Sequence, residues 1–345
     1  MDRVHTVPSM SAIDLLYQAA LNRPSARTLI INAHAHALLL DLSKKCEQVD
    51  LHQHFKPEHA AIHQLGLHAS ATLSNLEKTY HSILLLPSKN KQQTLAWMAA
   101  AMQLLGSDGS LLVACANNHG AKSYESALQS LAGNTISRSK SKCRLFSAKK
   151  NTSLDTTLLA QWLSTGEAKA ISSHGLIAQP GLFSWDHADI GSQLLIDHLP
   201  DNLSGTGMDL CSGYGLLSEH LLRTSPKIDT LHMVEADRLA LDCAMLNTKP
   251  WQQKTVPHWF DATRDALLEK LDWIVCNPPF HTAQQRDVEL GKTIVKRGCQ
   301  HLKRGGSIYV VANRKLAYET LMQTELRECQ TIIEANGFKI IKGIR

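Results

Sequence analysis

The sequence predicts an α/β protein with two tandem domains, each built on a doubly wound and mostly parallel sheet. Short apolar runs that suit buried strands alternate with longer helical patterns in both halves of the chain. The end of the chain differs, because two strand-like runs flank Asn336-Gly337, a dipeptide typical of tight hairpin turns. We therefore expect a C-terminal antiparallel hairpin at the end of the second sheet.

The order of segments in the first half recurs in the second half. A strand-like run, a run with proline at its end and a glycine-led run ending in Ala-Asn appear twice. The matching segments are 28–32 and 208–212, 83–89 and 274–280, and 109–117 and 306–313. Such self-similarity predicts duplication of one unit, although any two α/β domains share part of the pattern.

Glycine, serine and proline cluster over 165–182 and predict the domain boundary. We expect one domain over 1–175 and a second over 176–345. The first half lacks the motifs described next. It has Ala33 and Ala35 near the later glycine positions, and Ile30 provides no acid.

Asn277-Pro278-Pro279-Phe280 follows an apolar run that predicts a buried strand. Asn277 offers a side-chain carbonyl, Pro278 offers a backbone carbonyl, and Phe280 offers an aromatic face. Two acceptors beside a ring suit a planar group that bears an –NH2. An ordinary Pro-Pro turn after a strand is the alternative.

A glycine turn lies about sixty residues upstream, in Asp209-Leu210-Cys211-Ser212-Gly213-Tyr214-Gly215. Its glycines allow a ligand to approach the start of a helix. Asp209 is unsuited to a pyrophosphate and favours a cationic ligand with an amino-acid end. Glu235 ends the next strand, where a carboxylate can accept the hydroxyls of a ribose. Asp261 follows a third strand and suits the amine of an adenine.

This order of motifs resembles the class I S-adenosylmethionine-dependent methyltransferases. Asp189-Ile190-Gly191-Ser192-Gln193 and Ala312-Asn313-Arg314 narrow the resemblance to the bacterial ribosomal RNA guanine-N2 methyltransferases, small-subunit methyltransferase C and large-subunit methyltransferase G. The resemblance is strong over 180–345 and weaker over 1–180. It implies two Rossmann-like methyltransferase domains, the first degenerate and the second catalytic.

The resemblance also implies S-adenosyl-L-methionine as cofactor and a guanine amine of ribosomal RNA, 16S rather than 23S, as methyl acceptor. Asn277, Pro278 and Phe280 are then the expected catalytic residues. The expected cofactor-binding residues are Asp209, Gly213, Gly215, Glu235, Asp261 and Asn277. A protein glutamine methyltransferase, an adenine amine methyltransferase and a non-catalytic RNA-binding assembly factor remain alternatives.

Basic charge is concentrated in the first half of the chain. Residues 1–180 have 17 Lys+Arg and 11 Asp+Glu, a net charge of +6, whereas residues 181–345 have 19 and 20, a net charge of −1. Arg138, Lys140, Lys142 and Arg144 alternate with small residues, so on one strand they would share a face and contact RNA phosphates. A charged edge strand is the alternative. His281 is an expected RNA contact or a capping residue.

Other classes of protein fit the sequence poorly. It contains no apolar run that predicts a membrane span and no signal-peptide pattern at Met1-Asp2-Arg3. Its eight cysteines lack Cys-x-x-Cys spacing and are typical of a reducing cytoplasm. The histidines over 52–63 have no accompanying cysteine, so we expect no metal site. A monomer acting on ribosomal RNA or a ribosomal subunit is expected.

Overall fold

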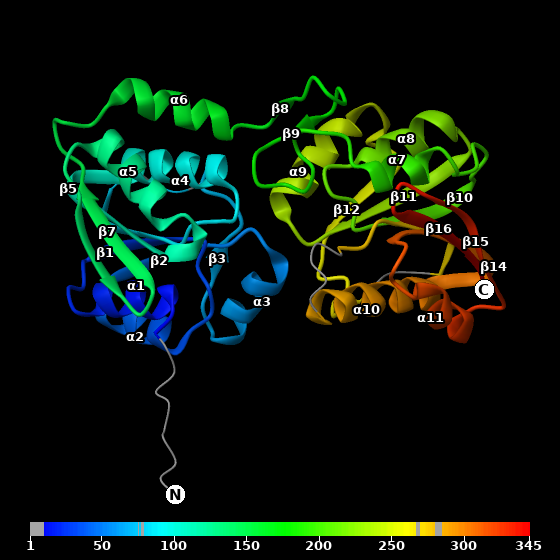
Figure 1. Ribbon diagram of the computed structural model, residues 1–345, viewed down its shortest axis with the longest axis horizontal. Coiled ribbons are helices and arrows are strands. Elements are labelled where there is room, and N and C mark those ends of the chain that lie inside the picture. The colour runs from blue at the N-terminus through cyan, green and yellow to red at the C-terminus, as the bar shows by residue number, and fades with distance from the viewer. Residues whose placement is uncertain (1–9, 75, 77–78, 267–269, 280–284) are drawn as a thin grey trace, which may run out of the picture. The chain divides into compact units, whose positions relative to one another are not determined.

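A computed structural model describes residues 10–74, 76, 79–266, 270–279 and 285–345, with backbone only for 285–287. The chain divides into two units, Met1–Glu167 and Ala168–Arg345, close to the boundary expected after residue 175. Each unit contains a seven-stranded sheet with helices on both faces (Figure 1). No helix among the described residues is long and apolar enough to cross a membrane.

The first sheet is parallel except at one end, where β7 runs antiparallel to both of its neighbours, β5 and β6. Its strands, in spatial order, are β3 (Ala69–Ser70), β2 (Gln48–His52), β1 (Arg27–Ile31), β4 (Tyr80–Leu85), β5 (Leu105–Ala116), β7 (Cys143–Lys149) and β6 (Ile136–Lys140). The helices of this unit are α1 (Ala12–Leu21), α2 (Ala37–Lys45), α3 (Lys56–Gln64), α4 (Lys91–Leu104), η1 (Asn117–His119), α5 (Ala121–Ala132) and α6 (Thr156–Gly166).

The second sheet has the same design. Its strands, in spatial order, are β12 (Thr255–Trp259), β11 (Ile228–Glu235), β10 (Gly205–Leu210), β13 (Leu271–Cys276), β14 (Leu302–Asn313), β16 (Phe338–Ile344) and β15 (Glu328–Ala335). The other elements are β8 (Lys169–Ala170), β9 (Ile177–Ala178), α7 (Ile190–Ile196), α8 (Leu216–Thr224), α9 (Arg238–Asn247), η2 (Lys249–Trp251), α10 (Gln285–His301) and α11 (Tyr318–Glu325).

Counted within each sheet, both units have the strand order 3-2-1-4-5-7-6. The same order in two consecutive units confirms the predicted duplication and the mostly parallel, doubly wound sheets. The predicted C-terminal hairpin is also present: β15 and β16 are antiparallel, and Asn336 and Gly337 at the turn have φ of 52° and 82°. Positive φ at both central residues is the geometry that Asn-Gly favours.

The second sheet is sealed on both faces because neighbouring side chains of a strand point to opposite sides. On β13, Ile274 and Cys276 pack into the core beneath α10 and α11. Trp273 and Val275 pack into the opposite core with α8 and α9. This continuous burial fixes the strands, and it leaves their carboxyl ends as the edge where polar side chains gather.

Candidate cofactor and amine site

The carboxyl ends of β10, β11 and β13 meet at one edge of the second sheet. Leu210 pairs with Val234 on one side and with Cys276 on the other. The next residues along each strand, Cys211, Glu235 and Asn277, therefore stand side by side. The glycine turn, the acidic strand end and the Asn-Pro-Pro motif, which are far apart in the sequence, belong to one site.

The turn between β10 and α8 exposes backbone to a ligand. Gly213 has a φ of 55°, and a Cβ added there would have no described atom within 4 Å. Gly215 has a φ of 86°, and a Cβ there would lie 3.0 Å from the Cα of Ala244 on α9. The two glycines thus do different things: Gly213 leaves open space, and Gly215 allows α8 to begin close against α9.

Glu235 ties the glycine turn to the end of β11. Its Oε2 accepts a hydrogen bond from the Gly213 N–H at 2.8 Å. Its Oε1 accepts from the N–H groups of Ala236 and Asp237 at 2.8 and 2.9 Å. Burial raises the pKa of Glu235 to about 7, although these backbone donors favour the charged form. Oε2 retains a lone pair that can accept a ribose hydroxyl.

Asp209 lies beneath the glycine turn with no exposed surface. Its Oδ2 accepts a hydrogen bond from the Ser218 hydroxyl at 2.6 Å, and its Oδ1 has no partner among the described residues. Burial, together with the charge of Glu235, raises the pKa of Asp209 to about 7. A buried, half-satisfied carboxyl of this kind suits a ligand that carries positive charge.

Asp261 lies two residues beyond β12 and is nearly buried. Its Oδ1 accepts hydrogen bonds from the N–H and hydroxyl of Thr263 at 2.9 and 2.6 Å, and its own N–H donates to Asp265 Oδ2 at 2.8 Å. Phe260, the residue before it, donates its N–H to the Glu235 carbonyl at 3.0 Å. These bonds fix Asp261 in a turn that follows the third strand of the site.

Asn277 directly follows β13, and its side chain is held by the start of α7. The amide nitrogen of Asn277 donates to Asp189 Oδ2 at 3.1 Å and to Ser192 Oγ at 2.8 Å. Pro278 continues the chain without an N–H group of its own. Phe280 and His281, the expected stacking and RNA-contact residues, lie outside the described residues.

The corresponding edge of the first sheet has lost these features. Because Ile31 pairs with His52 and Leu85 as Leu210 pairs with Val234 and Cys276, the two sites can be matched residue by residue. Ile30 then stands for Asp209, Gln53 for Glu235 and Leu86 for Asn277. His34 and His36, rather than the nearby Ala33 and Ala35, occupy the positions of Gly213 and Gly215.

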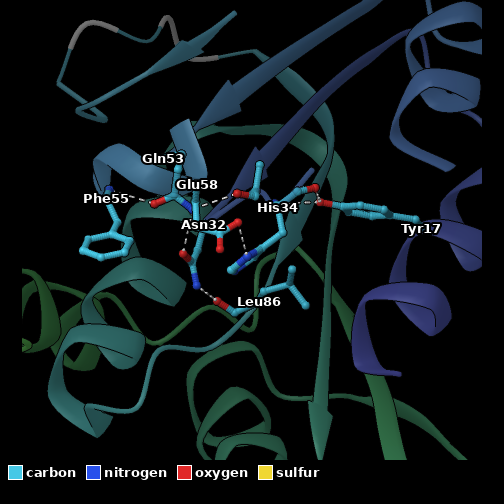
Figure 2. Close-up of polar contacts among 8 residues, drawn as sticks. Tyr17, Asn32, His34, Gln53, Phe55, Glu58 and Leu86 are labelled. Atoms are coloured by element: carbon cyan, nitrogen blue, oxygen red, sulfur yellow. Dashed lines mark hydrogen bonds and ion pairs between the residues drawn. The ribbon is translucent and has the colours of Figure 1, made fainter. Parts of the chain in front are cut away.

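In the first unit, His34 places a side chain at the position that Gly213 leaves open in the second unit. Figure 2 shows His34 turned toward Glu58, with the hydroxyl of Tyr17 beside its backbone. The His34 Nδ1 atom lies 3.0 Å from Glu58 Oε2, and the His34 N–H donates to the Tyr17 hydroxyl at 3.1 Å. Gln53 donates its amide N–H to the Ala33 carbonyl at 2.7 Å and accepts from the Phe55 N–H at 2.9 Å. The first unit therefore satisfies its strand ends internally.

The prediction that four basic side chains share one face of a single strand is wrong. Arg138 and Lys140 lie on β6, Lys142 lies in a turn, and Arg144 lies on β7. Ser141 and Lys142 have φ of 52° and 60°, so the chain reverses there and forms a hairpin. Arg144 pairs with Ser139 across the ladder, and its guanidinium forms a salt bridge with Glu125 on α5. Only the first three cations remain grouped on the exposed part of the hairpin.

Two sets of structural contacts in the site were not expected from the sequence. Asp189 and Ser192 contact Asn277 from 88 and 85 residues away, and their motif had only indicated a family resemblance. Asn247, at the end of α9, donates to the carbonyls of Tyr214 and Ile177, both at 2.8 Å, and so fixes the glycine turn. Neither set of contacts could be recognised from a local pattern in the sequence.

Four features together define a class I methyltransferase fold. They are the strand order 3-2-1-4-5-7-6, the glycine turn after the first strand, the acid at the end of the second strand and Asn-Pro-Pro after the fourth. Comparison with known families agrees with this class. The model of the methyltransferase small domain matches residues 173–342, and the model of the N-terminal domain of the same family matches residues 20–165. The chain belongs to the methyltransferase small domain family.

Curated relatives include the ribosomal RNA small subunit methyltransferase C of Vibrio vulnificus, 28% identical over 97% of this chain and 98% of the relative. That of Psychromonas ingrahamii is 28% identical over 78% of this chain and 77% of the relative. A solved T. thermophilus 16S rRNA N2 methyltransferase, in complex with AdoMet and guanosine, aligns with a TM-score of 0.80 and 21% identity. The alignment covers 99% of this chain and 93% of that one, so the fold is shared across both units.

Proposed function

We propose that this chain is a ribosomal RNA guanine-N2 methyltransferase that uses S-adenosyl-L-methionine and acts on the 16S RNA of the small subunit. The observation that carries the proposal is the meeting of Asn277 with the glycine turn at one sheet edge. An amine acceptor site thereby lies beside a site built for a cationic nucleoside. The names of the curated relatives support the same RNA and subunit.

The second unit offers polar groups and open space that suit the cofactor. Glu235 can accept a ribose hydroxyl, and Gly213 leaves room for the chain of the ligand. Asp261 is proposed to accept the amine of the adenine. The orphaned Oδ1 of Asp209 favours the positively charged amino-acid end. The cofactor supplies a methyl group activated by its attachment to a sulfonium, so positioning of the acceptor is the main task left to the protein.

Asn277 and Pro278 perform that positioning. The exocyclic amine of guanine is a weak nucleophile because its lone pair is conjugated with the ring. Carbonyl acceptors at the Asn277 side chain and the Pro278 backbone bind the two amine hydrogens and turn the lone pair toward the methyl group. The proton can leave after transfer, which removes the need for a strong general base. Phe280 is proposed to stack on the base.

The first unit is proposed to bind RNA and to support the catalytic unit without binding cofactor. Its equivalents of Asp209 and Glu235 are Ile30 and Gln53, and the imidazole of His34 occupies a glycine position. The acid at this edge, Glu58, is bonded to His34 within the unit, which does not favour binding of a cationic ligand there. The surplus basic charge of this unit instead favours phosphate contacts, with His281 of the second unit retained as a proposed RNA contact.

One cofactor is therefore expected to bind per chain, and the matched positions Glu235 and Gln53 should respond differently to mutation. Glu235→Ala should weaken cofactor binding about 5- to 150-fold, because a charge-assisted hydrogen bond of about 1–3 kcal/mol is lost. Gln53→Ala, the equivalent change in the first unit, should leave the affinity unchanged. Isothermal titration of the full chain measures both affinity and stoichiometry. Two sites per chain, or equal losses in both variants, would contradict the assignment.

The basic hairpin should contribute to RNA binding through Arg138, Lys140 and Lys142. Replacing these three residues with serine should lower the slope of log affinity against log salt by about 2 to 3 units, at 0.7–0.9 per phosphate contact by analogy with DNA. Lys44, Lys45 and Lys91, three exposed cations of the same unit, provide a charge-matched control when replaced together. A hairpin variant with the same slope as the control variant would show that the hairpin is only a charged edge.

The choice of substrate class can be tested by competition. Labelled cofactor should transfer its methyl group to undermodified 30S subunits or 16S RNA in preference to 50S subunits, DNA and glutamine-containing proteins. Label appearing mainly in protein would support a protein glutamine methyltransferase, and label in DNA would support an adenine amine methyltransferase. Cofactor binding without transfer to any of them would support a non-catalytic assembly factor.

A further inference from the structure

We infer that Asp189 and Ser192 are positioning residues that hold Asn277 with its carbonyl, and not its amino group, toward the methyl-accepting amine. The inference rests on the proposed function for the identity of that amine. It assigns a physical role to Asp189-Ile190-Gly191-Ser192, a run that in the sequence indicated only a family resemblance.

The contacts of Asn277 leave one orientation of its amide. Nδ2 carries two hydrogens, and it has two acceptors within reach, Asp189 Oδ2 at 3.1 Å and Ser192 Oγ at 2.8 Å. A carboxylate can only accept, so turning the amide over would place the Asn277 oxygen against the Asp189 oxygen. The Asn277 carbonyl is thereby directed away from α7 and is left for another donor.

The two acceptors are themselves fixed by the first turn of α7. Asp189 is the N-cap of this helix, and its Oδ2 also accepts from the Ser192 N–H at 2.7 Å. Ser192 is 6% exposed, so water does not compete freely for its hydroxyl. A Cβ at Gly191 would lie 3.3 Å from Asp189 Oδ2 and 3.2 Å from the Phe338 ring. Glycine at this position lets the turn pack on β16 without displacing the carboxylate.

This arrangement makes the site selective for an amine. With the Asn277 carbonyl held outward, the site presents two fixed acceptors, the Asn277 side chain and the Pro278 backbone. An –NH2 group can donate to both, whereas a keto oxygen at the same place would meet only like dipoles. Because the acceptors are oriented before the substrate arrives, no reorganisation is required at the moment of transfer.

The first test reads the orientation directly and does not depend on activity. In the free full-length protein, the side-chain NH2 pair of Asn277 should be protected from hydrogen exchange, as measured by NMR with Asn277→Ala to assign the signals. Ser192→Ala should remove much of this protection, while Gln193→Ala, an exposed neighbour on α7, should not. An unprotected NH2 pair in the wild-type protein would overturn the inference.

The second test measures transfer at saturating substrate. Ser192→Ala removes one acceptor while keeping the helix cap, and it should lower kcat about tenfold with cofactor Kd and RNA KM nearly unchanged. Asp189→Asn keeps a good N-cap residue but no longer fixes the amide, and it should lower kcat at least as much. Gln193→Ala should have normal kcat.

A double-mutant comparison with Asn277→Ala distinguishes a positioning role of Ser192 from a merely structural one. In an Asn277→Ala background, Ser192→Ala should cause no further loss of kcat, because the group that it positions is absent. An equal loss in both backgrounds, or normal kcat in both single variants, would refute the positioning role. A protected NH2 pair in a protein that fails to methylate guanine would instead refute the proposed function and leave the positioning of Asn277 standing.

Discussion

Asn277→Ala is expected to lower methyl transfer by about two to three orders of magnitude, the loss seen when one preorganised hydrogen-bonding group is removed from an active site. The cofactor affinity should stay close to normal, because the side chain is proposed to hold the target amine. This role is assigned because Asn277 follows β13, and its amide hydrogens already bind Asp189 and Ser192. Of its side-chain polar atoms this leaves the carbonyl oxygen, which is proposed to bind the target amine.

Single-turnover transfer and a binding titration on the same protein separate the two effects. Leu86→Ala, the equivalent change in the first unit, tests whether the loss is specific to the second sheet. It should leave the rate of transfer unchanged if the variant folds. If Asn277→Ala retained near-normal turnover, the acceptor role would be wrong, and Pro278 alone would have to orient the amine.

Asp209→Asn is expected to change stability in a strongly pH-dependent way. Burial raises the pKa of Asp209 from 3.8 to about 7, so between these values the folded chain binds a proton that the unfolded chain does not. This carboxyl therefore contributes stability below about pH 4 that is lost as the pH rises through 7. A shift of about three units corresponds to a loss of roughly 4 kcal/mol at most.

The asparagine variant should avoid this loss because it has no proton to release. Without cofactor, its free energy of unfolding should rise relative to wild type as the pH increases from 5 to 8. Glu235 titrates in both proteins, and its charge raises the pKa of Asp209, so the difference reports the two coupled carboxyls together. Gln193→Ala, at an exposed residue of α7 that does not titrate, is a suitable control. Parallel stability curves for wild type and Asp209→Asn would contradict the charge assigned to this buried site.

The same variant should bind cofactor more weakly, since the orphaned Oδ1 would no longer offer a negative charge to the ligand. A gain in the stability of the free protein combined with a loss of affinity is the expected signature of a buried group retained for binding. If the Asp209→Asn variant gained stability and kept full affinity, the buried charge would have no role toward the cofactor.

Much of the fold could be predicted because local patterns decide it. Apolar runs alternate with helical patterns, and Asn336-Gly337 supplies the positive φ that the last hairpin needs. The other hairpin was missed because Ser141 and Lys142 adopt positive φ without the glycine or asparagine that usually signals it. An alternating basic run across such a turn resembles a single strand.

The site was predicted less completely because its contacts join distant segments. The ends of parallel strands meet at one edge, so Glu235 and Asn277 could be brought together by topology alone. The bond from Asn277 to Asp189 spans 88 residues and follows from the packing of α7, which no periodicity describes. In the first unit, counting from the strand ends would have placed His34 and His36, instead of the adjacent alanines, at the glycine positions.

The most direct test of the account is to identify the methylated nucleoside. Undermodified 30S subunits and naked 16S RNA are incubated with the full-length protein and labelled cofactor, and the RNA is digested and analysed by mass spectrometry. We predict N2-methylguanosine as the labelled product with the wild-type chain and its near absence with Asn277→Ala. Label in methyladenosine, on an atom of guanine other than N2, or in ribosomal protein would contradict the proposed chemistry of the site.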